Sequence, residues 1–402
     1  MKHCLVRFCA GTIVCLFIAV LGCVQKPAPP PPKPKAPPKP SLVQLNPRFL
    51  KKIRFFDTES RESLRKAVER SIGYFKRFPE NKQISIASLS AVFSTGDFIR
   101  SLQGFLKLLD SDSLNFQRLS TLFDFYTYSV DGNRVLFTGY YEPVIEGSLV
   151  RTPKFSYPLY PLPPDLIKVN LKDFGVNCGI STISGRLDGR RLVPYYTRRD
   201  IDNGAIANVK PLFWVKDPVD AFFLQIQGSG VVRLPDGTVR RVGYAGSNGR
   251  PYRSIGRYMI EQGFMTEEDM SMQAIKSYFR KHSDRMWEVL WQNESYVFFR
   301  WVNEGPKGSI NVLLTPMRSI ASDPVYYPRG ALSYVITLVP GVKGGVRQFA
   351  GWVLHQDAGG AIRGPFRIDL FFGTGDDAGN LAGRMKYRGM VLLLLPKKEN
   401  FR

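Results

Sequence analysis

Two aspartates near the C-terminal end, Asp357 and Asp369, have the spacing and surroundings of catalytic carboxyls. They are twelve residues apart, and each lies at the margin of an apolar segment typical of a β-strand. Gly359 and Gly360 between them permit a tight turn or the close approach of a ligand. Partial burial of Asp369 among Ile, Leu and Phe would raise the pKa of its carboxyl, so that it could donate a proton. A third aspartate, Asp323, lies near a further strand.

The sequence offers little for other kinds of catalysis. Of its three histidines, His282 and His355 are isolated, so neither a histidine metal site nor a serine–histidine–aspartate triad is indicated. The glycine-rich segments 228–230 and 373–375 lack the lysine and hydroxyl residue of a phosphate-binding loop. We therefore expect no metal, nucleotide or other cofactor.

Aromatic residues beside glycine-rich turns form a second candidate set. The apolar faces of sugar rings stack on aromatic rings, while amide and hydroxyl side chains bind sugar hydroxyls and acetamides. The polar motifs 227–230 and 244–249 fit such a lining and include Gln227, Gly228 and Ser229. The aromatic residues are Tyr140, Tyr141, Phe222, Phe223, Tyr244, Tyr252 and Trp352.

The first globular stretch, 42–145, is expected to be the helical N-terminal part. Apolar residues recur at helical spacing between Leu64 and Phe75 and between Phe98 and Leu109. A strand at 134–137 then leads into the Thr-Gly-Tyr-Tyr-Glu-Pro motif at 138–143.

The central stretch, 146–250, is richer in Pro, Gly and β-forming residues and predicts an inserted β domain. It contains an apolar run at 221–227 that we interpret as a strand. A Pro-Asp-Gly turn inside 231–242 indicates a β-hairpin.

The last stretch, 251–402, predicts helices at 254–292 followed by strands. Ser254 suits a helix N-cap, and Thr266 with Asp269 resembles a capping box for a second helix. The expected strands are 296–301, 331–338, 349–354 and 390–395. Helices and strands in this order indicate an α+β protein, mainly β with α.

The N-terminus has the features of a bacterial lipoprotein. A basic start and a short apolar run at 12–21 indicate an export signal, 1–22. The run ends in Val-Leu-Gly-Cys, which resembles a lipobox and makes Cys23 the expected lipidation site. The Pro- and Lys-rich segment that follows gives a lipid anchor and stiff tether over 23–41.

The charge of the chain points to an anionic partner. There are 56 Lys and Arg against 34 Asp and Glu, a net charge of +22. An exported nucleic-acid binder is not expected, so the charge fits a carboxylate-rich cell wall or the anchoring membrane. Cys178 is then the one remaining thiol, and it cannot form an internal disulfide.

Several motifs in one order resemble the membrane-bound lytic transglycosylase A (MltA) family of murein-cleaving lipoproteins. The resemblance runs from Thr138 to about Gly389 and is weak over 45–125. The motifs are Thr138–Tyr141, Gln225–Gly230, Tyr244–Gly246, Tyr252–Gly256, Met270–Ile275 and Asp357–Asp369. Related sequences often carry His-Phe-Asp where this one has Arg367-Ile368-Asp369.

The resemblance implies a double-psi β-barrel, built from N- and C-terminal parts, with an inserted β domain and a groove between the two domains. The C-terminal part is similar to the three-aspartate (3D) domain. Its aspartates fall on Asp323, Asp357 and Asp369, with Asp369 catalytic. The substrate-binding residues expected from the resemblance and the motifs are Tyr140, Tyr141, Gln227, Gly228, Ser229, Tyr244, Asp323, Asp357, Gly359 and Gly360.

The implied activity is that of a lytic transglycosylase, exo or endo, acting on peptidoglycan. Asp369 alone would serve as acid and then as base, because the substrate's own C6 hydroxyl is the nucleophile. The expected location is the outer membrane, facing the periplasm, with peptidoglycan and cell-wall enzyme complexes as partners. A hydrolase that uses water, with Asp357 or Asp323 as base, and a wall-binding lipoprotein without activity remain alternatives.

Overall fold

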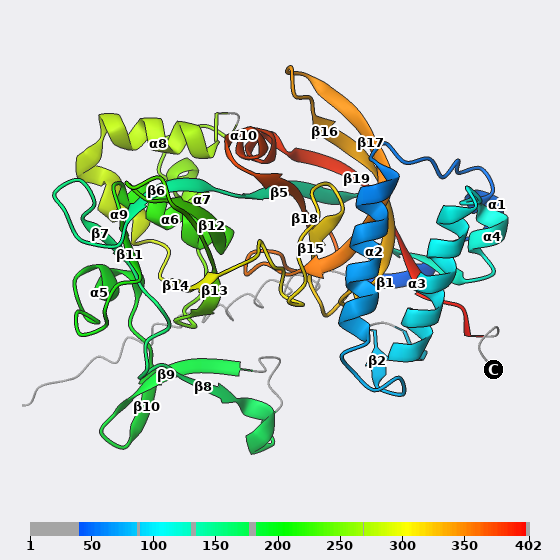
Figure 1. The fold of residues 1–402 in the computed structure, drawn as a ribbon, viewed down its shortest axis with the longest axis horizontal. Helices are drawn as coiled ribbons and strands as arrows, with labels where there is room; N and C mark the ends of the chain where they lie inside the picture. Colours follow the sequence, from blue (N-terminus) through cyan, green and yellow to red (C-terminus); the bar gives the residue numbers. More distant parts are fainter. Residues whose placement is uncertain (1–39, 87–88, 130–133, 177–181, 268, 399–402) are drawn as a thin grey trace, which may run out of the picture. The chain divides into compact units, whose positions relative to one another are not determined.

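The computed structural model describes residues 40–86, 89–129, 134–176, 182–267 and 269–398 (Figure 1). The expected signal 1–22 and lipidated Cys23 lie outside these residues, as do Cys178 and most of the tether. Across the described ranges, no helix combines the length and apolar character needed to cross a bilayer.

The largest sheet has eight strands, six of which form a closed ring. Its order is β1-β4-β19-β16-β17-β15-β18-β5, and β19 also pairs with β5, which closes the ring. The pairs β15–β17 and β18–β5 are parallel. The strands are β1 (Ser41–Gln44), β4 (Phe123–Ser129), β5 (Val135–Glu142), β15 (Ser319–Ala321), β16 (Leu332–Pro340), β17 (Val346–Asp357), β18 (Arg367–Thr374) and β19 (Lys386–Pro396). A barrel built from N- and C-terminal parts, as expected from the sequence, is confirmed.

Helices α2 and α3 lie side by side and share the core of this barrel (Figure 1). Ser60 caps α2, and Ser94 with Asp97 forms a capping box at the start of α3. The two apolar stripes expected from the sequence are buried. The remaining elements of this part are α1 (Pro47–Leu50), α2 (Arg61–Phe75), β2 (Gln83–Ser85), β3 (Val92–Ser94), α3 (Thr95–Asp110), α4 (Phe116–Leu119) and α10 (Asp376–Arg384).

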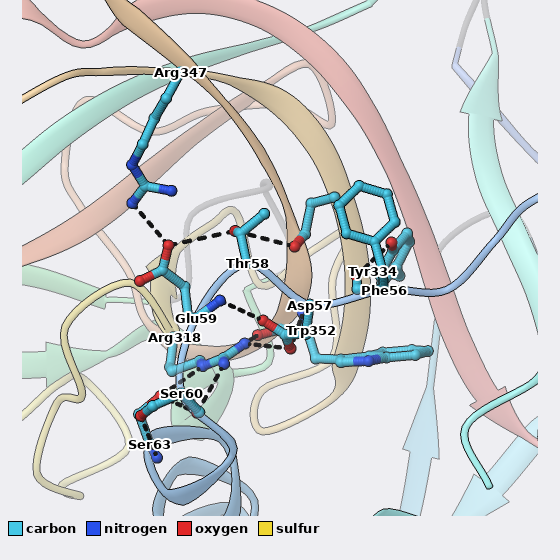
Figure 2. Close-up of polar contacts among 11 residues, drawn as sticks. Phe56, Asp57, Thr58, Glu59, Ser60, Ser63, Arg318, Tyr334, Arg347 and Trp352 are labelled. Atoms are coloured by element: carbon cyan, nitrogen blue, oxygen red, sulfur yellow. Dashed lines mark hydrogen bonds and ion pairs between the residues drawn. The ribbon is translucent and has the colours of Figure 1, made fainter. Parts of the chain in front are cut away.

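A buried arginine joins the start of α2 to the barrel. The guanidinium of Arg318 donates to Asp57 Oδ2 at 2.7 Å, to Ser63 Oγ at 3.0 Å and to the carbonyl of Trp352 at 2.9 Å. Figure 2 shows these partners converging on the one side chain. Arg318 directly precedes β15, so the network fixes that short strand against β17.

A second sheet of six strands contains the predicted hairpin. Its order is β14-β13-β12-β6-β11-β7. The hairpin is confirmed: β12 and β13 pair around Asp236, whose Oδ1 accepts from the Thr238 N–H at 2.8 Å. The strands are β6 (Val144–Ser148), β7 (Tyr157–Leu159), β11 (Phe213–Val215), β12 (Ser229–Arg233), β13 (Val239–Ser247) and β14 (Val297–Val302). Strand β14 lies beyond residue 250, where we predicted the inserted domain to end, so the sheet includes residues from both sides of that point. The domain boundary itself stays a prediction.

The barrel and the six-stranded sheet are also joined by a buried ion pair. Glu142, at the end of β5, is 1% exposed and pairs with Arg241 of β13. The Thr374 hydroxyl donates to the same carboxylate at 2.7 Å. Strand β5 ends at Glu142 and β6 begins at Val144, so the chain passes from one sheet to the other beside this ion pair.

The apolar run 221–227 is a helix, so the predicted strand is wrong. Helix α6 (Pro218–Gln227) begins after the N-cap Asp217 with proline at its first position, and it ends at Gly228 with φ 75°. Only glycine adopts that left-handed conformation without strain. The N-cap Asp217, Pro218 and the C-cap Gly228 favour a helix, although the apolar run alone is also compatible with a strand.

The helices predicted at 254–292 are present, but one predicted start is wrong. Ser254 caps the first of them, as expected. Thr266 and Asp269 bond to each other, yet the next helix begins after Ser271, whose hydroxyl accepts from the Ala274 N–H at 3.1 Å. The remaining elements are β8 (Ile167–Asn170), η1 (Leu171–Phe174), β9 (Thr182–Asp188), β10 (Arg191–Pro194), α5 (Arg198–Asp202), α7 (Ile255–Glu261), α8 (Met272–Lys281), η2 (Ser283–Arg285) and α9 (Met286–Leu290).

Candidate active site

The short strand β15 brings the two key aspartates together. Ala321 is the register partner of Asp369 on β18 and also of Asp357 on β17. Adjacent strands lie about 4.8 Å apart, so the two aspartate backbones are separated by about two strand spacings. Residues twelve positions apart in sequence thus flank one strand.

Asp369 is a partly buried carboxyl with a raised pKa. Burial raises the pKa to about 6; the nearby guanidinium of Arg367 opposes this, and the carboxylate of Asp357 adds to it. Thr138, the register partner of Asp369 on β5, donates a hydrogen bond from its hydroxyl to Oδ1. Because its pKa is raised, the carboxyl can hold a proton near pH 6. Because the residue is only partly buried, it can transfer that proton to a bound ligand.

Asp357 is held by backbone N–H groups. Its Oδ1 accepts from Ala358 at 2.8 Å and from Ser309 at 2.8 Å. Burial raises the pKa of Asp357, while these two N–H groups lower it. Its orientation is fixed from two directions, which keeps its charge beside Asp369.

Tyr140 is close to both carboxyls. It is two residues after Thr138 on β5, hence on the same face, and its ring is 5.2 Å from that of Phe371. Its hydroxyl is buried without a hydrogen bond of standard geometry to any described residue. Burial, followed by the charges of Asp357 and Asp369, raises the pKa of Tyr140 well above its usual range. The hydroxyl is therefore a neutral donor at the site.

Asp323 orders the loop between the other two aspartates. Its oxygens accept from the N–H groups of Val325 at 3.0 Å and Gly364 at 2.8 Å. The left-handed residue of that loop is Gly364, with φ 75°, whereas Gly359 and Gly360 lie in a turn without positive φ. Space around Gly360 is open, as close approach of a ligand would require.

Gln227 connects helix α6 to the strand that carries Tyr140. Its Oε1 accepts from the Tyr141 N–H at 3.1 Å. The Tyr141 ring is buried, and its hydroxyl contacts the Met272 sulfur at 3.5 Å. Gly228 follows as the helix cap, so Gln227 and Gly228 shape the backbone beside β5.

The remaining aromatic candidates divide into core and surface residues. Trp352 is fully buried against Phe55, and Phe222 is also buried, so the interpretation of these two as sugar-stacking residues is wrong. Tyr244 on β13 is 51% exposed, and Ser229 starts the neighbouring strand β12. Tyr252 is accessible and close enough to Asp369 for its carboxylate to raise the Tyr252 pKa, after the larger effect of burial.

Thr138 and Arg367 have functional positions that were not assigned from the sequence. Thr138 lies within a recognised motif, but its contact depends on pairing β5 with β18. Arg367 lies two positions before Asp369 on β18, and its charge lowers the pKa of Asp369.

His355 belongs to the core. Its two ring nitrogens bond to Ser322 and Ser333, each at 2.8 Å, and burial lowers its pKa to about 3. Among the residues that the structure covers, no group of three or more His, Cys, Asp or Glu side chains is arranged to hold a metal ion.

Comparison with known proteins agrees with this geometry. The MltA specific insert domain matches residues 136–300, and the 3D domain matches residues 318–395. The membrane-bound lytic murein transglycosylase A of Escherichia coli K12 is 35% identical over 265 residues, which cover 65% of this chain and 65% of that protein. The relative from Vibrio cholerae is 34% identical over 267 residues, 64% of each chain. The match thus spans just under two thirds of these curated relatives.

Solved structures are similar over more of the chain. The membrane-bound lytic murein transglycosylase from Agrobacterium tumefaciens has a TM-score of 0.73 at 26% identity, covering 89% of this chain and 98% of that one. Escherichia coli MltA with bound chitohexaose has a TM-score of 0.68 at 26% identity, covering 89% and 95%. MltA from Neisseria gonorrhoeae, in a monoclinic form, has a TM-score of 0.61 at 33% identity, covering 80% and 96%. With matching domains, shared identity and a common fold, the chain belongs to the MltA family of membrane-bound lytic murein transglycosylases.

Proposed function

We propose that this protein cleaves the β-1,4 bond between N-acetylmuramic acid and N-acetylglucosamine in peptidoglycan, with Asp369 as its single acid/base. The observation that carries the proposal is the partly buried Asp369 carboxyl, which accepts from Thr138 and whose pKa is raised to about 6 beside a second aspartate. The family and the chitohexaose bound to the Escherichia coli relative support a glycan substrate.

The reaction needs no second carboxyl. Protonated Asp369 gives its proton to the glycosidic oxygen, and the bond from that oxygen to C1 of the muramic acid breaks. The resulting carboxylate takes the proton of the C6 hydroxyl as the C6 oxygen bonds to C1. The products are a free N-acetylglucosamine end and a 1,6-anhydro ring, water is not consumed, and Asp369 is protonated again.

The neighbouring residues support these steps in different ways. The negative charge of Asp357 raises the pKa of Asp369 and so favours its protonated form. The Thr138 hydroxyl orients the Asp369 carboxyl. The buried Tyr140 hydroxyl is proposed to support the Asp357 carboxylate, and the open space at Gly360 is proposed to admit the substrate. Gln227, Gly228, Ser229, Tyr141, Tyr244 and Gly359 are proposed to shape the glycan-binding surface, and Asp323 is proposed to position the loop.

The proposed location is the outer membrane, with the enzyme facing the periplasm. The relatives are named membrane-bound, and Cys23 ends a lipobox-like motif that is followed by a Pro-rich tether. An anchor with a spacer would let the enzyme reach the wall and join complexes of other cell-wall enzymes.

The deciding experiment is mass analysis of muropeptides released from purified sacculi. A lytic transglycosylase leaves 1,6-anhydro-muramic ends, lighter by one water than hydrolysis products. Reducing ends of full mass would identify a hydrolase instead. Binding to sacculi with no loss of turbidity would identify a wall-binding protein.

A further inference from the structure

A cavity of about 340 Å³ lies beside the six-stranded sheet, and its walls combine aromatic rings with polar and charged side chains. Tyr157 of β7, Trp214 of β11 and Trp287 of α9 contribute partly exposed rings to it. The Tyr157 and Trp287 rings are 6.1 Å apart. Its volume is in the range of about 300–1,000 Å³ that is usual for small-molecule sites.

The cavity has a polar wall that is ready to accept a hydrogen bond. Gln225 of α6 lines it and is only 4% exposed, and its Oε1 makes no hydrogen bond of standard geometry within the described chain, although its amide is close enough to the hydroxyl of Tyr296, on the same wall, to lower the Tyr296 pKa. An unsatisfied buried acceptor costs stability, so its retention suggests a donor from a ligand. Asp202 adds further acceptor oxygens.

The charged part of the wall is held rigidly. Arg198 is 3% exposed and donates to the carbonyl of Asn293 at 2.9 Å and to that of Ser295 at 2.6 Å. Its guanidinium also lies 4.6 Å from the centre of the Phe222 ring. Because these contacts fix Arg198, the site has a preformed shape that needs little ordering on binding.

We propose that this cavity is an accessory sugar site that binds one N-acetylhexosamine unit of a glycan strand. A pyranose ring has an apolar face for the indoles of Trp214 and Trp287. Its hydroxyl and acetamide donors meet the acceptor oxygens of Gln225 and Asp202. The combination of flat apolar walls with buried acceptors fits a sugar better than a purely apolar ligand.

The cavity is separate from the site around Asp369. Gln225 and Gln227 are two positions apart on α6, so their side chains leave the helix in different directions. Gln227 bonds to the strand that carries Tyr140, while Gln225 faces the cavity. One helix therefore connects the two sites, and the accessory site would retain a glycan strand between cleavage events.

This inference rests on the proposed function for its ligand, and the test keeps the two apart. The full chain with Asp369→Asn is titrated with N,N′,N″-triacetylchitotriose while the indole N–H signals of its five tryptophans are followed by NMR. Signals of Trp214 and Trp287 should shift, whereas those of Trp301 and the buried Trp352 should not. Gln225→Met should abolish these shifts without lowering the melting temperature, because the lost oxygen made no hydrogen bond of standard geometry.

A matched control comes from the same part of the chain. Phe174→Ala removes a ring that is 72% exposed and does not line this cavity, and it should leave the shifts unchanged. In an otherwise unaltered enzyme, Gln225→Met should raise KM for sacculi roughly fivefold, the size of one hydrogen bond, with kcat unchanged.

Three results would overturn the accessory site. These are static Trp214 and Trp287 signals, shifts that persist in Gln225→Met, and shifts produced by a murein stem peptide in place of the sugar. The proposed function is tested by a separate measurement, the detection of 1,6-anhydro ends among the products of the unaltered enzyme.

Discussion

Arg318 is fully buried, and its guanidinium is ion-paired with Asp57 at 2.7 Å (Figure 2). The two residues are 261 positions apart in the sequence. The pair ties the segment before α2 to the strand β15, which separates Asp357 from Asp369. The support of the active site thus begins at a residue far from it in sequence.

Replacing Arg318 should destabilise the protein strongly. Arg318→Met leaves the largely buried Asp57 carboxylate without its partner, which costs about 3–5 kcal/mol of unfolding free energy. Urea unfolding followed by circular dichroism measures the loss. The double variant Asp57→Asn/Arg318→Met should recover part of it. If Arg318→Met is as stable as the unaltered protein, the network does not hold the barrel together.

Asp369→Asn should abolish turnover, and Asp357→Asn should weaken it. Asparagine keeps the shape of Asp369 but cannot transfer a proton, so kcat on sacculi should fall at least ~100-fold with murein binding retained. Asp357→Asn keeps an acceptor for the N–H groups of Ala358 and Ser309 but removes a negative charge. Its activity should therefore fall less. Near-normal rates for Asp369→Asn beside an inactive Asp357→Asn would exchange the two roles.

Substitutions at two neighbours of Asp369, Thr138 and Asp357, should move the alkaline limb of the pH–activity profile in opposite directions. The unaltered enzyme should lose activity as pH rises through about 6, because the acid must be protonated. Thr138→Val removes a donor to the carboxylate, which raises the pKa of Asp369 and moves this alkaline limb to higher pH. Asp357→Asn removes repulsion and moves it to lower pH. Thr138→Ser, which retains the hydroxyl, is the control, and identical limbs in all variants would contradict the assignment.

Asp369 should also cost stability above its pKa. Burial raises its folded-state pKa from 3.8 to about 6, so the native protein binds the proton more tightly than the unfolded chain. The contribution of Asp369 to stability therefore declines from about pH 4 to about pH 6. Asp369→Asn should gain up to about 3 kcal/mol over the unaltered protein at pH 7.5 and little at pH 4. Urea unfolding at both pH values tests this, and an equal gain at both would rule out the titration.

Cys23→Ala should release an active enzyme from the membrane. The residue is the expected site of lipidation, and the body that carries Asp369 follows the tether. Cell fractionation with a murein assay on each fraction measures the outcome. A variant that still sediments with membranes would show that the lipid is not the anchor.

Strong local patterns made much of the fold predictable. Helices α2 and α3 and the β12–β13 hairpin have apolar spacing, caps and turn residues that agree with one another. Helix α6 was mistaken for a strand because its deciding residues, Asp217, Pro218 and Gly228, lie outside the apolar run. Short apolar runs do not separate helix from strand by themselves.

The sequence indicated that the carboxyls of the candidate site belong together, but not what surrounds them. Asp357 and Asp369 carry a recognisable motif, whereas the contact between Thr138 and Asp369 arises from the parallel pairing of β5 with β18. The burial of Trp352 depends on Phe55, which comes from a distant segment. From the sequence alone, Glu142 is an ordinary polar residue at the end of a strand. Its ion pair with Arg241 depends on the packing of two sheets.

The order of strands in the barrel has a consequence for biogenesis. Strand β5 is synthesised before the six-stranded sheet, yet its partners β18 and β19 are among the last elements to be made. During synthesis, β5 must therefore emerge with both edges unpaired and remain so until the C-terminal residues arrive. Such edges invite aggregation, and distant pairings form slowly. The pairing that surrounds Asp369 is therefore not assembled until the chain is nearly complete, so an unfinished chain lacks the candidate site.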